Sequence, residues 1–229
     1  MKNLVAVLLF LTFNICNAGV FLEPLQGSDK IFRGRAPKSS EIKSLVKNGI
    51  TSVLIFKNQT KTEVDDERSA LLAAGFDETK IYHIPFPWKD FTSEQTACEQ
   101  IIDSLNILKA VESSDADRIL FHCTVGEDRT GLLAGLMTQL LDQAGTEDSF
   151  RNQMCAKGYA GGNASKPPQV SRTVDRFLTP LYYKISIMIQ DQVLNLQTLN
   201  SRSAKKLCKK IANIDTSAQF KTCEQVSGL

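Results

Sequence analysis

The chain has 229 residues, of which 42% are hydrophobic and 23% are charged. This is an ordinary globular composition, and the length suits one domain with an appended part. The formal net charge of +2 excludes a strongly basic nucleic-acid-binding protein and an acidic tail protein. No stretch after residue 20 reaches the roughly 18 apolar residues that span a bilayer, so we expect no stable membrane insertion.

The first residues have the pattern of a secretory signal. Lys2 gives a short positive region, residues 4–13 are apolar, and Cys16-Asn17-Ala18 places small residues where a signal peptidase reads. We therefore predict a signal peptide over residues 1–18. The mature protein is expected in the periplasm or outside the cell.

Short apolar segments alternate with amphipathic segments from residue 31 onward. The pattern predicts strands at 31–37, 50–56, 81–86 and 118–122. Helices are predicted at 39–49, 67–75, 92–108 and 130–144. The first is capped by Ser39 or Ser40 and buries Ile42, Leu45 and Val46. This alternation is typical of an α/β fold with a central, mostly parallel sheet flanked by helices.

Beyond Gly145 the strand pattern ends. Residues 146–157, 170–195 and 203–212 are predicted to be helical, with a loop rich in Gly and Pro at 158–169. These segments would be extra C-terminal helices added to the α/β part.

The informative segment runs from Arg118 to Gly131 and reads as a strand, a seven-residue loop and a helix. Backbone N–H groups of such a loop converge below a helix N-terminus and bind a tetrahedral dianion. The same field lowers the pKa of a cysteine such as Cys123 and makes it a nucleophile. Arg129 can hold two phosphate oxygens with its planar fork, and Gly126 lets the loop curl.

The sequence His-Cys-x5-Arg-Thr-Gly resembles the signature loop of the protein tyrosine phosphatase superfamily. It is closest in type to secreted bacterial inositol polyphosphatases (cysteine phytases) and to atypical dual-specificity phosphatases. The ending Arg129-Thr130-Gly131 argues against a rhodanese-type sulfur transferase. The phosphate-binding loop would comprise His122, Cys123, Thr124, Val125, Gly126, Glu127, Asp128 and Arg129.

The resemblance implies a phosphatase domain over residues 19–195 and a C-terminal helical extension over 196–229, packed on or next to that domain. Cys123 would attack phosphorus and form a phosphocysteine, which water hydrolyses. Thr130 would hydrogen-bond the departing thiolate, and His122 would orient the loop. No metal or other cofactor is needed, and His83 and His122 do not form a ligand cluster.

The general acid is expected on a loop upstream of the nucleophile. Asp90 fits, because it follows a strand and precedes a helix. Asp128 inside the loop is the alternative, since related loops with Gly-Lys-Asp-Arg-Thr-Gly are thought to use that aspartate.

The substrate is predicted to be an inositol (poly)phosphate, contacted by Lys57, Lys61 and Lys89 at strand ends and loops. Glu127 is a departure from the pattern, because an acid there would repel additional phosphates. The alternatives are a secreted tyrosine or dual-specificity protein phosphatase acting on a phosphoprotein and a phosphate-binding module without turnover. No nucleic acid is expected as a partner, and the oligomeric state is left open.

Five cysteines follow the predicted signal peptide, and disulfides are permitted outside the cytosol. Cys208 and Cys223 bracket a short segment and are expected to pair with each other, leaving Cys98 with Cys155. Cys123 would then be the free thiol. Buried thiols are the alternative to these disulfides.

Overall fold

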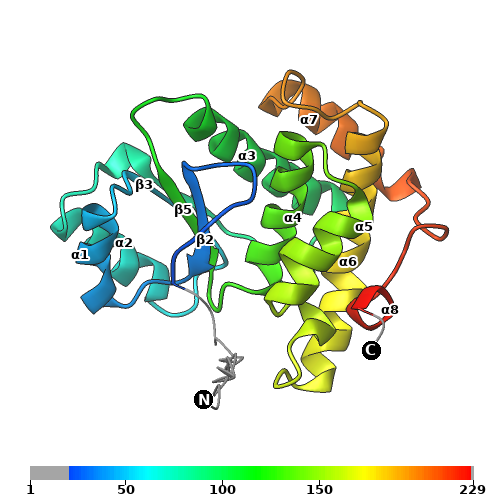
Figure 1. Cartoon of the computed structure of the whole chain (residues 1–229), viewed down its shortest axis with the longest axis horizontal. Coiled ribbons are helices and arrows are strands. Elements are labelled where there is room, and N and C mark those ends of the chain that lie inside the picture. Colours follow the sequence, from blue (N-terminus) through cyan, green and yellow to red (C-terminus); the bar gives the residue numbers. More distant parts are fainter. Residues whose placement is uncertain (1–20, 228–229) are drawn as a thin grey trace, which may run out of the picture.

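A computed structural model describes residues 21–227 of the chain (Figure 1). The predicted signal peptide lies outside the described residues. The sheet has five strands in the order β1-β2-β5-β3-β4. The strands are β1 (Glu23–Pro24), β2 (Ile31–Arg35), β3 (Ser52–Phe56), β4 (Ile81–Ile84) and β5 (Ile119–Cys123).

Four of the strands are parallel, and β1 alone runs antiparallel to its neighbour β2. The predicted α/β fold with a mostly parallel sheet is therefore confirmed. The two-residue strand β1 was missed, because two residues are too few to show a strand period. The central strands β3 and β5 are buried along their whole length, which explains their continuous apolar sequences.

Helices cover both faces of the sheet (Figure 1). On one face, α1 (Ser39–Lys47) and α2 (Glu63–Ala73) share a core with Val53 and Ile55. On the other, α3 (Glu94–Glu112), α4 (Asp128–Asp142) and α6 (Pro168–Gln190) share a core with Leu54 and Phe56. Alternate residues of β3 thus point into two different cores.

The C-terminal third is helical and packs on the α4 side of the sheet. It contains α5 (Thr146–Ser149), a π-helical turn (Phe150–Met154), α6, α7 (Ser201–Cys208) and α8 (Cys223–Ser227). Short 3₁₀ turns lie at Glu78–Lys80, Cys155–Lys157, Ala160–Gly162 and Ile211–Asn213. The helix predicted over 170–195 starts earlier, with Pro168 at its first position, and ends at Gln190.

Two details of α1 differ from the prediction. The N-cap is Lys38 rather than a serine, and the Glu41 carboxylate accepts a hydrogen bond from the Lys38 backbone N–H at 2.7 Å. Val46 was expected in the core but is 49% exposed. Ile42 and Leu45 already fill the buried stripe of this short helix.

The disulfides correct the predicted pairing. Cys98 is bonded to Cys208, and Cys155 is bonded to Cys223. Each bridge joins segments that are far apart in sequence, by 110 and 68 residues. Proximity along the chain was therefore a poor guide, because packing of α7 on α3 decides which thiols meet. Among the described residues, Cys123 is the cysteine without a disulfide partner.

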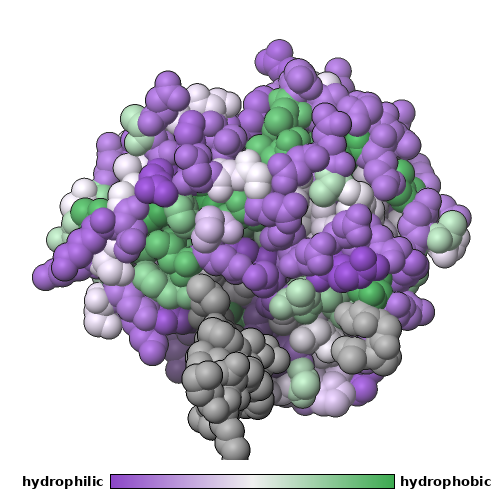
Figure 2. Space-filling view, in the orientation of Figure 1, coloured by the Kyte–Doolittle hydropathy of each residue, from purple (hydrophilic) through white to green (hydrophobic). Residues whose placement is uncertain are grey.

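Hydrophilic residues cover most of the face in Figure 2, with hydrophobic residues showing between them. Four large hydrophobic residues of the described part are exposed: Val46, Leu72, Val125 and Val193. Between residues 21 and 227, none of the helices has both the length and the apolar content to cross a membrane.

Candidate active site

The loop from Cys123 to Arg129 joins the end of β5 to the start of α4. Gly126 has a φ of +79°, and a Cβ on it would lie 2.7 Å from backbone atoms of Gly34 and Arg35. The position therefore requires glycine for both its conformation and its close approach to β2. Arg33, which is buried in β2, donates a hydrogen bond to the Gly126 carbonyl at 3.3 Å.

Arg33 was not singled out as a site residue by the sequence, because one arginine in a short strand carries no special pattern. Its guanidinium also donates to the Gln153 carbonyl. Burial lowers the pKa of Arg33 to about 10, so the group is still charged at neutral pH. A buried cation thus supports the loop from beneath.

Cys123 lies at the base of the loop with 1% of its surface exposed. Its backbone N–H donates to the Thr130 hydroxyl oxygen at 2.8 Å. Burial raises the pKa of the Cys123 thiol, but the Arg129 charge and hydrogen bonds from Thr130 and from backbone N–H groups of the loop outweigh burial. The net result is a pKa below the usual thiol value, which favours the nucleophilic thiolate.

Arg129 lies in the first turn of α4 and turns its guanidinium toward an open cleft. It donates to the Phe86 carbonyl and to the Thr124 hydroxyl, both at 3.1 Å. The cleft has a volume of about 450 Å³ and brings together two loops that follow β3 and β4 with the loop that follows β5. It is lined by Asn58, Gln59, Thr60, Pro87, Trp88, Lys89, Asp90, Thr124 and Arg129.

His122 has a buried acidic partner that sequence reasoning missed. Its Nε2 lies 2.8 Å from the Glu67 carboxylate of α2, and its Nδ1 lies 2.8 Å from the Cys123 carbonyl oxygen. Burial acts to lower the pKa of His122, but the neighbouring Glu67 carboxylate and the Cys123 backbone and thiolate raise it overall. No local pattern links Glu67 to His122, since the helix and the strand meet only in the fold.

Lys57 corrects the prediction of a substrate contact. Its side chain is only 4% exposed, and its ammonium lies 3.4 Å from Glu63 and 3.9 Å from Glu67. The carboxylates of α2 hold it inside the protein, and it does not line the cleft. The strand end was correctly placed, but the side chain points to the helix.

The other two lysines differ in position. Lys89 lines the cleft with Arg129, and its ammonium lies 5.3 Å from the centre of the Trp88 ring. Lys61 is exposed in the neighbouring turn and is not part of the cleft lining. One of the three predicted lysines therefore shares the cleft with Arg129.

The two aspartates proposed as the general acid have different surroundings. Asp90 lines the cleft and has a 76% exposed side chain and a φ of +54°. Asp128 points to the other side of the loop, where its Oδ1 accepts hydrogen bonds from Lys166 at 2.5 Å and from the Ala160 N–H at 2.9 Å. The cleft therefore contains Asp90 and not Asp128.

Glu127 was expected to repel additional phosphates, but the groups around its carboxylate offset that negative charge. Its carboxylate is 3.0 Å from the Lys166 ammonium and accepts a hydrogen bond from the Asn163 amide at 2.9 Å. The charge is paired with the 158–166 segment and is only 13% exposed.

The histidines take part in no cluster of three or more potential metal ligands between residues 21 and 227. His83 Nε2 lies 2.9 Å from the Lys57 carbonyl oxygen, so its ring joins β4 to the end of β3.

Residues 43–148 match the family model described as "Tyrosine phosphatase family". The match begins inside α1, contains β3, β4 and β5 with the helices α2, α3 and α4, and includes the whole loop from Cys123 to Arg129. Over these residues, slightly less than half of the chain, the sequence is similar to the tyrosine phosphatase family. The chain is a cysteine-dependent phosphatase. No curated protein matches the chain in sequence.

Several solved structures are similar to this phosphatase. A complex of P. aeruginosa TpbA with pTyr is 16% identical over 75% of this chain and 96% of that chain, with a TM-score of 0.47. Tk-PTP in the active form is 17% identical over 72% and 97%, with a TM-score of 0.48. The core catalytic domain of the PP-IP phosphatase SIW14 from S. cerevisiae, in complex with citrate, is 15% identical over 76% and 93%, with a TM-score of 0.46.

Proposed function

We propose that this phosphatase hydrolyses phosphomonoesters through a phosphocysteine intermediate without a metal ion. The observation that carries the proposal is the buried Cys123 with its lowered pKa, in the same loop as an Arg129 that lines an open cleft. Arg129 supplies the positive charge for the phosphoryl oxygens, and its fork matches two of them.

In the first step the Cys123 thiolate attacks phosphorus, and the bond from phosphorus to the ester oxygen breaks. The leaving oxygen takes a proton from the Asp90 carboxyl group. In the second step water attacks the phosphocysteine, and the Asp90 carboxylate accepts the proton of that water. The sulfur departs as a thiolate, which the Thr130 hydroxyl stabilises.

Asp90 is the better general acid because it lies in the cleft, where the leaving group must be. Asp128 has its Oδ1 occupied by Lys166 and by a backbone N–H, and it does not line the cleft that holds Arg129. The exposed loop that carries Asp90 and its left-handed backbone suit a segment that closes on the substrate.

The proposed substrate is an inositol (poly)phosphate. The cleft presents Lys89 and Arg129 as cations, and Asn58, Gln59 and Thr60 as hydrogen-bonding groups for a phosphorylated polyol. The ion pair between Glu127 and Lys166 offsets the negative charge that would otherwise repel additional phosphates. Lys89 also lies over one face of Trp88, which leaves less of the ring free to stack on an aromatic substrate.

A second candidate substrate is a phosphotyrosyl protein. Pro87 and Trp88 form an apolar side of the cleft, and an aryl phosphate would pack there while its phosphate reached Arg129. These residues distinguish the two candidates, since the polyol would depend on Lys89 and the aryl group on Trp88.

The experiment compares kcat/KM on inositol hexakisphosphate and on a phosphotyrosyl peptide, with the Cys123→Ser protein as the blank. We expect a preference for the inositol phosphate, and a preferential loss of that activity in Lys89→Met. Lys61→Met is the matched control, because Lys61 is exposed outside the cleft. Preference for the peptide would assign the enzyme to phosphoproteins, and near-normal turnover by Cys123→Ser would refute the mechanism.

Export of the enzyme is proposed on the N-terminal signal pattern. The four cysteines in disulfides support it, because such bonds persist in oxidising compartments. Mass spectrometry of the mature protein tests it, and a chain that keeps residues 1–18 would contradict cleavage there.

A further inference from the structure

Lys166 has a buried side chain that contacts both acidic residues of the phosphate-binding loop. Its side chain is 6% exposed. Its ammonium lies 3.0 Å from the Glu127 carboxylate and donates to Asp128 Oδ1 at 2.5 Å and to the Gly158 carbonyl at 2.8 Å. An ammonium has three donors, so these contacts use all of them and Lys166 has none left for a substrate.

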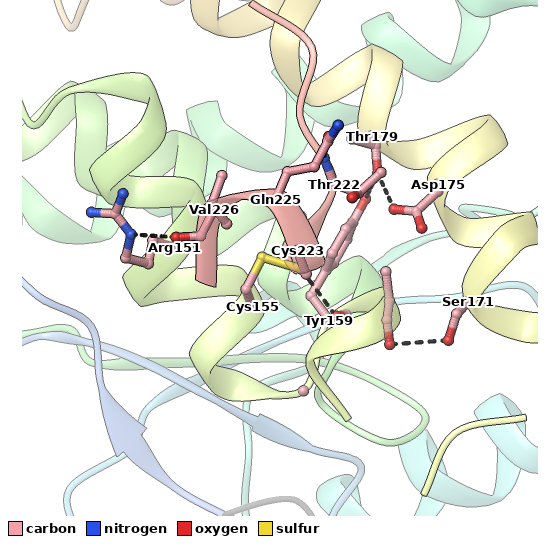
Figure 3. Close-up of a disulfide and its surroundings, with 12 residues drawn as sticks. Arg151, Cys155, Tyr159, Ser171, Asp175, Thr179, Thr222, Cys223, Gln225 and Val226 are labelled. Carbon is pink, nitrogen blue, oxygen red and sulfur yellow. Dashed lines mark hydrogen bonds between the residues drawn. A yellow bond between two sulfur atoms is a disulfide. The ribbon is translucent and has the colours of Figure 1, made fainter. Parts of the chain in front are cut away.

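The segment that carries Lys166 is fixed to the rest of the protein. The disulfide between Cys155 and Cys223 joins its start to α8 (Figure 3). The Tyr159 hydroxyl lies 3.0 Å from that of Thr179 on α6, and Ser171 donates to the Ala160 carbonyl. Lys166 is thus presented to the loop from a rigid support.

The loop itself receives further bonds from this segment. Asn163 donates to Glu127 at 2.9 Å, and the Ala160 N–H donates to Asp128 at 2.9 Å. A Cβ on Gly158 would come within 2.9 Å of the Glu127 side chain, so the segment packs closely on the loop. Both carboxylates are held on the side of the loop away from the cleft.

Charge explains why a cation is needed at this place. Glu127 and Asp128 directly precede Arg129, so two carboxylates lie beside a loop that must bind a dianion. Their repulsion would oppose the attraction of Arg129, since charges of opposite sign at similar distances cancel. A buried carboxylate without a counter-ion is also costly.

We propose that Lys166 is a positioning residue of this phosphatase: it neutralises the acidic pair Glu127 and Asp128 and holds the loop so that it binds a phosphate dianion. The inference rests on the proposed function of the loop. Lys166 acts through the loop and does not touch the substrate.

The test begins with Lys166→Met and Lys166→Arg. We expect Lys166→Met to raise KM by about 10- to 100-fold while kcat changes within about threefold. Lys166→Arg keeps the positive charge, so its KM should stay close to that of the unchanged protein. Lys157→Met is the matched control, because Lys157 directly precedes the 158–166 segment but pairs with Glu23. Circular dichroism and thermal melting establish that each variant is folded.

Charge rescue separates electrostatics from packing. Adding Glu127→Gln to Lys166→Met removes one of the carboxylates that lost its partner. We expect the double variant to bind phosphate about tenfold more tightly than Lys166→Met alone. A purely structural role of Lys166 predicts no such recovery, since the second substitution would only remove another contact.

Equilibrium binding of inorganic phosphate to the same variants in a Cys123→Ser background provides a readout without turnover. Weaker phosphate binding in Lys166→Met supports the proposal even if the natural substrate is misassigned. Unchanged phosphate affinity and KM in a folded Lys166→Met, or an arginine variant as impaired as the methionine variant, overturns it. Turnover by Cys123→Ser would refute the proposed function separately.

Discussion

The buried pair of His122 and Glu67 offers a sharp test of how the protein supports its loop. The perturbation is Glu67→Gln, which keeps the side-chain shape but removes the charge. His122 Nε2 is 2.8 Å from Glu67, and both side chains are buried. Removing one partner of a buried ion pair costs about 3–5 kcal/mol. Because glutamine keeps an acceptor oxygen, we expect the low end, about 3 kcal/mol.

The sign of the pH dependence follows from His122. Its pKa in the folded protein is raised above the unfolded value of about 6.5. The ion pair therefore stabilises the fold fully below about pH 6.5 and loses that contribution as the pH rises through the folded pKa. The destabilisation by Glu67→Gln should be largest near pH 6 and smaller near pH 9.5. What remains at high pH is the lost contact between Glu67 and Lys57.

The assay is urea unfolding with both disulfides intact, in a Cys123→Ser background that removes the thiolate titration. Glu63→Gln is the matched control, because Glu63 pairs with Lys57 but not with His122. It should cost less than about 1 kcal/mol and show no such pH dependence. An equal loss for Glu67→Gln at both pH values, or the same profile in the control, would refute the reasoning.

Two further predictions concern the cleft and the loop. Asp90→Asn should slow hydrolysis of esters with poor leaving groups by about 10²–10⁴-fold while changing activated aryl phosphates far less; an equal loss for both, or none, moves the acid role to Asp128. Gly126→Ala should abolish most of the activity and destabilise the fold by more than the roughly 1–2 kcal/mol expected for Gly75→Ala. Gly75 also has a positive φ, but a Cβ there meets nothing within 4 Å. Equal unfolding free energies for the two alanine variants would show that the contact with β2 is harmless.

Much of the fold followed from local patterns. The short apolar strands and the helices between them were visible because burial on both faces of β3 and β5 demands continuous apolar sequence. Helix α3 was recognisable from the cap at Ser93, whose hydroxyl accepts from the Thr96 N–H. Local patterns located the ends of elements less well: Val46 near the end of α1 is exposed, and α6 starts at Pro168 rather than at residue 170. The segments that pack against an element determine where it ends.

The phosphate-binding loop is the part that sequence alone determined, because all its groups lie within eight residues. The spacing from Cys123 to Arg129 dictates a strand, a tight loop and a helix start, whatever surrounds them. Only the tertiary structure decided the partners of that loop. Lys57 turned out to face α2, Glu67 meets His122, and Lys166 reaches Glu127 across 39 positions of chain. The disulfide partners depend in the same way on packing, because residues distant in sequence become neighbours only when helices cover the sheet.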